Sequence, residues 1–439
     1  MGFVTKQFTD RTPTMADSTD PVLVLDANGQ AGLHVVRSLG KRGVPVTAGS
    51  SVRRSLGRLS RYSDGAYQYP AIEASPERFV SELVEYLETT DHFAVVPVAD
   101  MSSVVLSKHK TEIEATGTLV AGEGWDTFER AWDKGRLFEL NESLPVPAPT
   151  TMDPSSVEAV AEMAPELSYP VLVKPRSKIS WDESGGYHRI EVDDSLYVSS
   201  ASELVPTYRR LLDQYPFLAA EGHYPLVQEY IDGSTTATVV VATDGEVAAS
   251  FQEERVRTHP ASGGNSTLLR ARSDDRMAEY AAAVIDALQW TGPAMVEFME
   301  TPEGEFYLIE VNGRYWGSLP FAINCGVDFP WLHYRQLRGL PLDAPDSYPT
   351  DRLQQRLVYG DLKWLIEQVR GGHPAAPLHV LWASIVANVT FVSRSDPLPT
   401  LGTLGQMAQL GLQTATDRLG NATSGTEPDG PDPHEEAPR

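Results

Sequence analysis

Two acidic residues stand inside apolar, strand-like runs in the stretch MVEFMETPEGEFYLIEVNGRYW, residues 295–316. The segments AMVEFME and EFYLIEV alternate apolar and polar residues, and PEG between them is typical of a turn, so the pattern predicts a β-hairpin. A turn centred on Glu303 and Gly304 would place Glu297 directly opposite Glu310. Like charges in that arrangement destabilise a hairpin, so we expect a positive group beside them.

The same hairpin offers a set of oxygen ligands. Asn312 follows Glu310 by two residues and therefore points to the same face. Glu297, Glu310 and Asn312 form the kind of set that Mg²⁺ prefers, and Mg²⁺ usually shares its shell with nucleotide phosphates. Arg314, two residues further on, would reach the same phosphates. Zinc is not expected because no His or Cys lies nearby, and the alternative is a structural pair of acids compensated by an arginine.

Lysine is scarce, since only eight of the 36 basic residues are lysines, and two of them stand at informative positions. Lys174 ends the apolar run PVLVK beside the glycine-containing loop SWDESGGYHR, and Lys134 falls in a predicted helix. An ammonium group beside a flexible glycine loop can hold a polyphosphate, with backbone N–H groups closing over it. Each lysine taken singly is more often a surface charge, but together in this chain the two favour phosphate binding.

The segment LVQEYIDGS, residues 226–234, reads as a strand that connects two subdomains. Such a strand can present the carbonyl of Glu229 and the N–H of Ile231 to the edge of an adenine. This readout needs no particular side chain, so the spacing alone is also compatible with an ordinary connecting strand.

Two arginines, Arg255 and Arg257, alternate on one face of a predicted strand before the loop PASGGNST. Guanidinium groups bind a carboxylate or an acyl phosphate bidentately, so both arginines are candidates for substrate binding. The alternative is that they are surface residues paired with the neighbouring Glu253 and Glu254.

The elements around these residues fall into two patterns. The run PVLVLDANGQAGLHVVRSLGKRGVPVTAGSS predicts strand, glycine turn, helix and strand, which opens a parallel α/β domain that continues through FAVVPVAD to about residue 125. Its turn lacks the glycine spacing of a dinucleotide fingerprint, so a tight turn is favoured over a cofactor site. Beyond it, hairpin turns indicate antiparallel α+β organisation, with strands over 169–176, 189–192, 226–231, 236–243 and 246–256 and a helix over 274–290.

Composition bounds the function. The 439 residues leave room for two or three domains, and the net charge of −24 makes nucleic acid and anionic membranes unlikely partners. The lone Cys325 excludes an internal disulfide and fits a reducing cytoplasm. Without an 18-residue apolar run or a signal-peptide core, the expectation is a cytoplasmic protein. An acid-rich, lysine-poor surface also suggests a salt-accumulating microbe, with an ordinary acidic protein as the alternative.

The ordered series AWDK, YPVLVKP, LVQEYIDG, RVRTHPASGGNST, MVEFM and LIEVNGRYWGS resembles the ATP-grasp superfamily, in particular its carboxylate-amine ligases and carbamoyl-phosphate-synthase-like members. Together with the composition, the resemblance suggests a halophilic archaeon as the source. It implies an α/β and α+β fold, in which a Rossmann-like parallel α/β domain precedes the ATP-grasp fold and a helical or mixed appendage follows. The expected boundaries are a flexible N-terminus at 1–19, the Rossmann-like domain at 20–125, the ATP-grasp domain at 126–340 with a mobile lid at about 140–225, the appendage at 341–414 and a disordered acidic tail at 415–439.

The resemblance also implies roles for individual residues. Lys134 and Lys174 would contact ATP phosphates, while Glu297, Glu310 and Asn312 would hold Mg²⁺, or Mn²⁺ in its place. Arg314 would steady the phosphate or the substrate. The adenine hinge would consist of Gln228, Glu229, Tyr230 and Ile231. An acid that binds ribose in many members is absent after the hinge, which leaves ribose contact to Asp232 or to a hydroxyl of Ser234, Thr235 or Thr236.

The implied reaction activates a carboxylate as an acyl phosphate with the γ-phosphate of ATP, after which an amine such as an amino acid attacks. Phosphoryl transfer of this kind needs mainly positioning and charge neutralisation, which lysines, arginines and a metal supply. One alternative is a carboxylase-like enzyme that activates bicarbonate, although no biotin-carrier segment is found. A second is a non-catalytic ATP-binding regulatory protein, although the residues needed for catalysis are present. A homodimer is a superfamily-level expectation.

Overall fold

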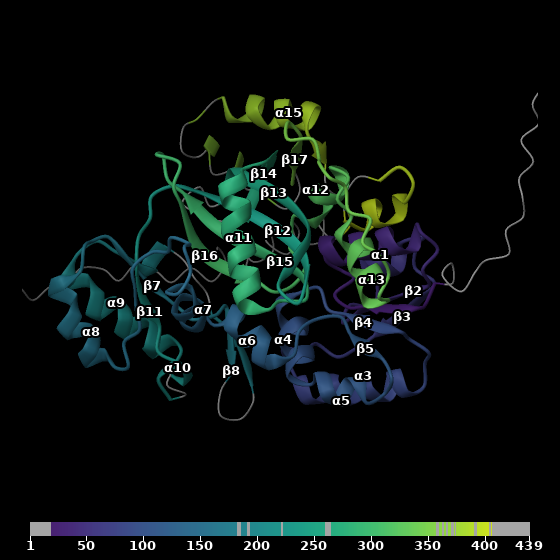
Figure 1. The fold of residues 1–439 in the computed structure, drawn as a ribbon, viewed down its shortest axis with the longest axis horizontal. Helices are drawn as coiled ribbons and strands as arrows, with labels where there is room; N and C mark the ends of the chain where they lie inside the picture. Colours follow the sequence, from purple (N-terminus) through teal and green to yellow (C-terminus); the bar gives the residue numbers. More distant parts are fainter. Residues whose placement is uncertain are drawn as a thin grey trace, which may run out of the picture.

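The structure is a computed structural model that describes residues 19–181, 186–190, 194–220, 223–259, 265–356, 360–361, 364–365, 368–369, 373, 375–389, 393–403 and 405. Both predicted disordered ends therefore lie almost entirely outside the described residues. Within them the chain forms four β-sheets, and Figure 1 shows the four-stranded sheet at one end of the molecule and the parallel sheet at the other. The domain boundaries and the mobility of the lid stay predictions.

A five-stranded parallel sheet forms the N-terminal part, as the sequence predicted. Its strand order is β3-β2-β1-β4-β5, and β1 and β4 are buried apolar runs, which is typical of parallel strands. The tight turn after β1 needs Gly32, because a Cβ there would lie 2.4 Å from the Asp26 carbonyl oxygen. The elements are β1 (Val22–Val24), α1 (Gln30–Gly40), β2 (Val46–Ser50), α2 (Leu56–Leu59), β3 (Gly65–Gln68), α3 (Pro76–Glu88), β4 (Ala94–Val96), α4 (Asp100–Lys108), α5 (Lys110–Glu114) and β5 (Leu119–Val120).

An antiparallel four-stranded sheet, in the order β10-β7-β11-β6, forms the second part. Helices α8 and α9 share a hydrophobic core with it. Two further helices, α6 (Trp125–Trp132) and α7 (Lys134–Asn141), lead into this part. Its elements are β6 (Thr151–Met152), α8 (Val157–Met163), η1 (Ala164–Glu166), β7 (Val171–Lys174), η2 (Asp194–Leu196), β10 (Tyr197–Val198), α9 (Ala201–Gln214), α10 (Phe217–Ala220) and β11 (Leu226–Glu229).

A separate hairpin, β8 (Ile179–Trp181) and β9 (Tyr187–Arg189), projects from the four-stranded part. Of the predicted strand over 189–192, only Arg189 belongs to a strand among the described residues, because β9 ends there. The next side chain, Ile190, is buried in the core of the four-stranded sheet instead of continuing the alternation. The rest of that predicted strand, and most of the glycine loop before β9, lie outside the described residues.

The largest sheet has seven strands in the order β16-β15-β12-β13-β14-β17-β18. Helix α11 covers one face; it begins where Asp274 caps the Met277 N–H at 3.0 Å and ends at the left-handed Gln289. The elements are β12 (Ser234–Thr243), β13 (Glu246–His259), β14 (Asn265–Arg272), α11 (Asp275–Leu288), β15 (Gly292–Glu300), β16 (Phe306–Asn312), α12 (Leu319–Asn324), α13 (Phe329–Leu337), β17 (Leu353–Gln355), α15 (Ala376–Val386) and β18 (Asn388–Val389).

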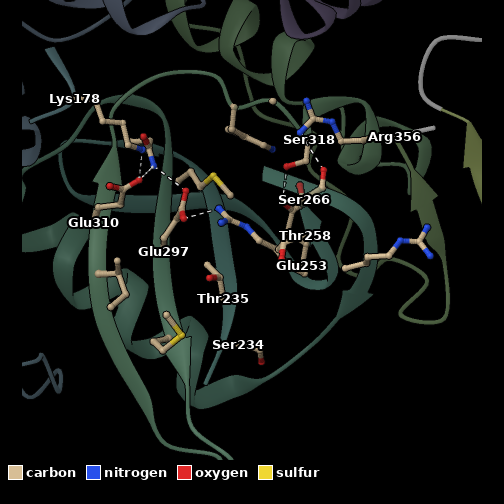
Figure 2. Close-up of a pocket in the computed structure, with 18 of the residues that line it drawn as sticks. Lys178, Ser234, Thr235, Glu253, Thr258, Ser266, Glu297, Glu310, Ser318 and Arg356 are labelled. Carbon is tan, nitrogen blue, oxygen red and sulfur yellow. Dashed lines mark hydrogen bonds and ion pairs between the residues drawn. The ribbon is translucent and has the colours of Figure 1, made fainter. Parts of the chain in front are cut away.

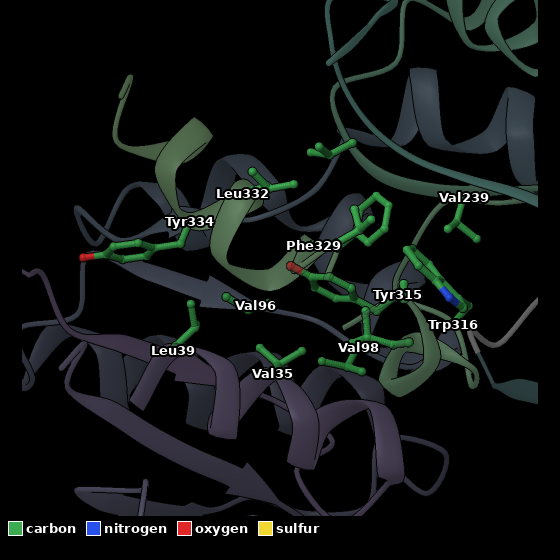
Figure 3. Close-up of a cluster of buried hydrophobic side chains, with 14 of the residues drawn as sticks. Val35, Leu39, Val96, Val98, Val239, Tyr315, Trp316, Phe329, Leu332 and Tyr334 are labelled. Carbon is green, nitrogen blue, oxygen red and sulfur yellow. The ribbon is translucent and has the colours of Figure 1, made fainter. Parts of the chain in front are cut away.

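The other face of this sheet shares a core with the N-terminal part. Figure 3 shows Val35 and Leu39 of α1 lying below Phe329, Leu332 and Tyr334 of α13, with Val239 of β12 at the far side. Helix α1 contacts both α12 and α13. The parallel sheet and the seven-stranded sheet are therefore joined through buried apolar side chains.

The β15–β16 hairpin has the predicted pairing, with Glu297 opposite Glu310. The predicted turn is off by one residue, however, because Thr301 pairs with Glu305 in the turn and Phe298 pairs with Leu308. A β-bulge between Glu297 and Phe298, where Ile309 of β16 has no residue opposite it, supplies the missing residue. This bulge, rather than the turn, brings Glu310 opposite Glu297.

The C-terminal segment is mixed, as predicted. Strand β17 extends the large sheet by pairing with β14, and β18 pairs with β17 in parallel. Asp396 returns to the N-terminal part, where it accepts hydrogen bonds from Arg37 at 2.8 Å and from Ser60 at 2.7 Å. Most of residues 362–372 lie outside the described residues. None of the helices in the described ranges is long and apolar enough to cross a membrane.

Candidate functional site

A cavity of about 1700 Å³ opens where the parallel, four-stranded and seven-stranded sheets meet. Figure 2 shows Glu297 and Glu310 on one side of it, and Glu253, Ser318, Ser266 and Arg356 on the other. The β1–α1 turn, the end of β7, the chain after β11 and helix α15 also contribute to the lining. Most of the residues that the sequence singled out therefore face one space.

The two opposed acids are compensated by three cations. Glu310 is 9 % exposed and lies 2.8 Å from the Lys178 Nζ and 3.2 Å from the Lys134 Nζ. Glu297 is 8 % exposed and lies 2.7 Å from the Arg255 Nη2. Burial by itself would raise the pKa of Glu310, but Lys178 and Lys134 hold that pKa well below its usual range. The positive groups that the hairpin required are present.

Asn312 joins the two acids. Its Nδ2 donates to Glu297 Oε1 at 3.0 Å and to Glu310 Oε1 at 3.1 Å, while its Oδ1 accepts from Arg314 Nη2 at 3.1 Å. Arg314 is held in turn by Asp100 of α4, which raises the pKa of the guanidinium against the opposing effect of burial. The four predicted residues therefore form one continuous network.

The donor set of this network fits Mg²⁺, which proteins commonly hold through one or two carboxylates together with substrate phosphates. Glu297 and Glu310 would supply the carboxylates, and the Asn312 amide would supply an oxygen once it turns its Oδ1 toward them. Among the described residues, no group of three or more His, Cys, Asp or Glu could hold a metal ion.

Lys174 stands apart from the acids. Its Nζ lies 2.9 Å from Gln228 Oε1, and it forms none of the ion pairs found among the described residues. Burial, together with the nearby charge of Lys134, lowers the pKa of Lys174 to about 7. A buried amine in this state gains an interaction when an anion enters the cavity.

Lys178 is a site residue that the sequence reasoning missed. It precedes β8 and bonds to Glu310, which raises the pKa of the lysine. The hairpin that follows is fixed by Lys108 of α4, whose Nζ lies 3.0 Å from the centroid of the Trp181 ring and 4.6 Å from that of Trp125. The scarcity of lysine was a signal that applied to Lys178 as well as to Lys174.

The predicted hinge lines the cavity through Gln228, Glu229, Tyr230 and Ile231. Glu229 is tied to the four-stranded sheet, because its N–H donates to the Thr150 carbonyl at 2.9 Å and its side chain accepts from the Thr150 N–H at 3.0 Å. Of the candidates for ribose contact, Ser234 and Thr235 line the cavity (Figure 2), whereas Asp232 is exposed and is not among the described lining residues.

The two candidate arginines have different partners. Arg255 reaches Glu297, so it belongs to the acidic hairpin. Arg257 lines the cavity, but its Nε lies 2.8 Å from the fully buried Asp361 and its guanidinium lies 4.5 Å from the centroid of the Trp364 ring. The alternative pairing with Glu253 and Glu254 does not occur, since Glu254 pairs with Arg270 and Arg272 and Glu253 accepts from Ser318.

Known proteins that resemble this chain point to one fold and one superfamily. Residues 223–359 match the family described as ATP-grasp in the biosynthetic pathway with Ter operon. The carbamoyl phosphate synthase large chain of Halobacterium salinarum is 25 % identical over 332 residues, which cover 72 % of this chain and 30 % of that protein. The chain spans less than half the length of the curated relatives that it matches.

Two solved structures share the fold. The biotin carboxylase of Campylobacter jejuni superposes with a TM-score of 0.61 and 18 % identity, covering 77 % of this chain and 75 % of that one. The L-amino acid ligase of Bacillus licheniformis gives a TM-score of 0.53 and 15 % identity, covering 73 % and 74 %. Residues 223–359 thus match an ATP-grasp family model, in agreement with the resemblance. Among curated proteins, its relatives include large chains of carbamoyl phosphate synthase. The salt-accumulating source stays a prediction.

Proposed function

We propose that the protein is an ATP-dependent ligase that activates a carboxylate as an acyl phosphate and joins it to an amine. The observation that carries the proposal is the buried pair of acids in the cavity, where Lys134 and Lys178 pair with Glu310 while Lys174 lines the same cavity and bonds to Gln228. Three ammonium groups beside two carboxylates suit a polyphosphate with its metal, because charge neutralisation is the main requirement of phosphoryl transfer.

In this proposal the nucleotide spans the cavity from the hinge to the hairpin. The adenine lies against the chain at Glu229 to Ile231, and Ser234 and Thr235 lie where ribose hydroxyls would be reached. The phosphates then pass over Lys174 toward Glu297 and Glu310. When bound, Mg²⁺, or Mn²⁺ in its place, would neutralise charge that develops on the transferred phosphoryl group.

The lysines exchange partners when the nucleotide enters. Lys134 and Lys178, which bond Glu310 in the structure, turn to phosphate oxygens and release the carboxylate. Arg314 exchanges the Asn312 amide for a phosphate or carboxylate oxygen in the same way. Arg255 is the better of the two candidates for the substrate carboxylate, since Arg257 has its Nε and Nη2 engaged by Asp361.

Activation of bicarbonate is the second candidate function, because the same fold is found in the biotin carboxylase of Campylobacter jejuni. A non-catalytic ATP-binding protein is the third. The proposed substrates are a small carboxylate and an amine. The protein is also expected to form a homodimer, which light scattering would test.

The test is phosphate release from ATP with Mg²⁺ in a high-potassium buffer. Pooled amino acids, pooled small carboxylic acids and bicarbonate are added in separate reactions. Glu310→Ala serves as the inactive variant and Glu303→Ala, exposed in the same hairpin, as its matched control. Stimulation by an acid pool that needs an amine supports the ligase, and stimulation by bicarbonate alone supports the carboxylase. Protection of the protein by ATP from thermal unfolding, without stimulation by any addition, supports the non-catalytic reading.

A further inference from the structure

A third acid lies on the same face of the large sheet as the two opposed acids. Strand pairing places Glu310 opposite Glu297, Glu297 opposite Ala237, and Ala237 opposite Glu253. These four residues form one row across β16, β15, β12 and β13, which we call the acid row. Because side chains of paired residues point to one face of a sheet, all three carboxyl groups lie on the cavity side.

Glu253 lacks the partners that the other two acids have. It lines the cavity, is 2 % exposed, and receives a 2.5 Å hydrogen bond from Ser318 Oγ on Oε1. Within the described residues, its buried Oε2 has no hydrogen-bond partner, and no ion pair to Glu253 is found. An enclosed carboxyl oxygen without a donor costs about 1–3 kcal/mol, so the position is poor for a purely structural residue.

The charges around Glu253 indicate which kind of ligand would bind its free carboxyl oxygen. Arg255, Glu297 and Arg356 are the charged groups that act on Glu253 from β13, β15 and the chain after β17, and none of them hydrogen-bonds to it in the described residues. Burial raises the pKa of Glu253 to about 7, against the lowering effects of Ser318 and Arg255. A group that gives up its proton near neutrality and has a free acceptor position suits a hydrogen-bond donor that carries positive charge.

The position along the acid row fits an attacking amine. Glu253 lies two strands from Glu297, a backbone separation of about 10 Å, with only the small Ala237 between them. If the phosphoryl group lies over Glu297 and Glu310, the acyl carbon lies beyond it and the nucleophile about 3 Å further along. That path ends above Ala237, within reach of Glu253.

We infer that Glu253 binds the ammonium group of the amine substrate, a protonated primary amine, and accepts one proton from it before attack. The inference rests on the proposed ligase function. The neutral amine then attacks the acyl carbon, so that a C–N bond forms and the C–O bond to phosphate breaks. Inorganic phosphate leaves with the bonding electron pair and takes up the second proton lost from nitrogen, and Glu253 returns its own proton to water.

The test compares Glu253→Gln, which keeps the size and the acceptor for Ser318, with Glu254→Gln on the opposite face of β13. Both variants are assayed with the carboxylic acid pool and either pooled amino acids plus ammonium chloride or hydroxylamine, which is largely unprotonated at neutral pH. We expect Glu253→Gln to lose about 100-fold in amine-dependent ADP formation, the usual scale for a lost acid–base group. Hydroxamate formation should stay within about threefold, and Glu254→Gln should resemble the wild type in both assays.

A second measurement does not need turnover. Thermal unfolding with MgADP is followed in methylammonium chloride and in tetramethylammonium chloride at equal ionic strength, since only methylammonium can donate hydrogen bonds. If methylammonium stabilises the wild type but not Glu253→Gln, the amine site is supported even when no pool stimulates phosphate release. In that case only the ligase proposal fails. The inference is overturned if Glu253→Gln loses hydroxamate formation equally, if it keeps amine-dependent turnover, or if neither turnover nor the methylammonium effect depends on Glu253.

Discussion

Glu310 and Glu253 stand at the two ends of one acid row, yet their surroundings are opposite. Glu310 touches Lys178 and Lys134, which hold its pKa well below the usual range against the effect of burial, whereas burial raises the pKa of Glu253 to about 7. Both residues are buried, with exposed fractions of 9 % for Glu310 and 2 % for Glu253. Burial therefore does not decide the charge of an acid in this cavity, and the presence or absence of a contacting cation does.

The largest effect is expected from Glu310→Ala. The change removes a proposed metal ligand and leaves Lys134 and Lys178 without their carboxylate, so ATP turnover should fall by about 10²–10³-fold or more. Phosphate release measures the effect, while circular dichroism checks that the fold is kept. Turnover close to that of Glu303→Ala would remove Glu310 from the metal site.

The pH dependence of stability should differ between the wild type and Glu253→Gln. The folded pKa of about 7 lies above the ordinary value of 4.5, so the native state binds this proton more tightly than the unfolded state. The contribution of this proton to the free energy of unfolding is therefore fully present below about pH 4.5. It is lost as the pH rises through 7, which lowers the free energy of unfolding by up to about 3 kcal/mol. Urea unfolding between pH 5 and 8 should show this loss in the wild type only, and parallel curves would contradict it.

Lys174 should take up a proton when ATP binds at pH 8. Its pKa of about 7 leaves the free amine mostly neutral there, and phosphate oxygens raise that pKa. Titration calorimetry in two buffers of different ionisation enthalpy should give an uptake of up to about one proton per ATP. Lys174→Met should abolish most of it, while Lys178→Met should not, because Glu310 already raises the pKa of Lys178. Equal uptake in both variants would be evidence against this assignment.

The smallest effect is expected from Lys108→Met. The substitution removes the cation between Trp125 and Trp181, a contact worth about 1–2 kcal/mol when partly desolvated. Because β8 follows Lys178 directly, looser docking should raise the KM for ATP a few-fold with little change in kcat. Hydrogen exchange at β8 and β9 measures the docking, with Lys110→Gln as the control on the neighbouring helix. Unchanged exchange would show that the ring contacts do not hold the hairpin.

Local patterns were enough to predict the parallel sheet, the hairpin and many of the residues that line the cavity, but not Lys178 or the role of Glu253. Apolar runs such as β1 and β4 are visible in the local sequence, and so is the alternation of apolar and polar residues around Glu297. The pairing of Glu297 with Glu310 was predicted from a turn that is one residue out, and a bulge restores it. Turn chemistry alone could not reveal this bulge, because nothing in the hairpin sequence marks it.

Contacts between distant segments were not accessible in the same way. Arg257 is engaged by Asp361, 104 residues further along the chain, so its partner depends on how the C-terminal segment packs. Glu253 looked like a neighbour for an arginine, whereas its partner is Ser318 on the loop before α12. Burial and charge at these positions arise from tertiary packing, which periodicity and spacing do not contain.

The backbone of the sheet fixes the spacing of the residues in the acid row. The distance between Glu297 and Glu253 is set by the hydrogen-bonded spacing of β15, β12 and β13, about 4.8 Å per step, and not by any flexible side chain. Point substitutions can change the side chain at each position of the acid row, but they cannot change the spacing of the backbone positions. Relatives of this chain that accept larger or smaller substrates would therefore have to differ in the loops around the cavity, while the interval between the proposed metal and amine sites would stay constant.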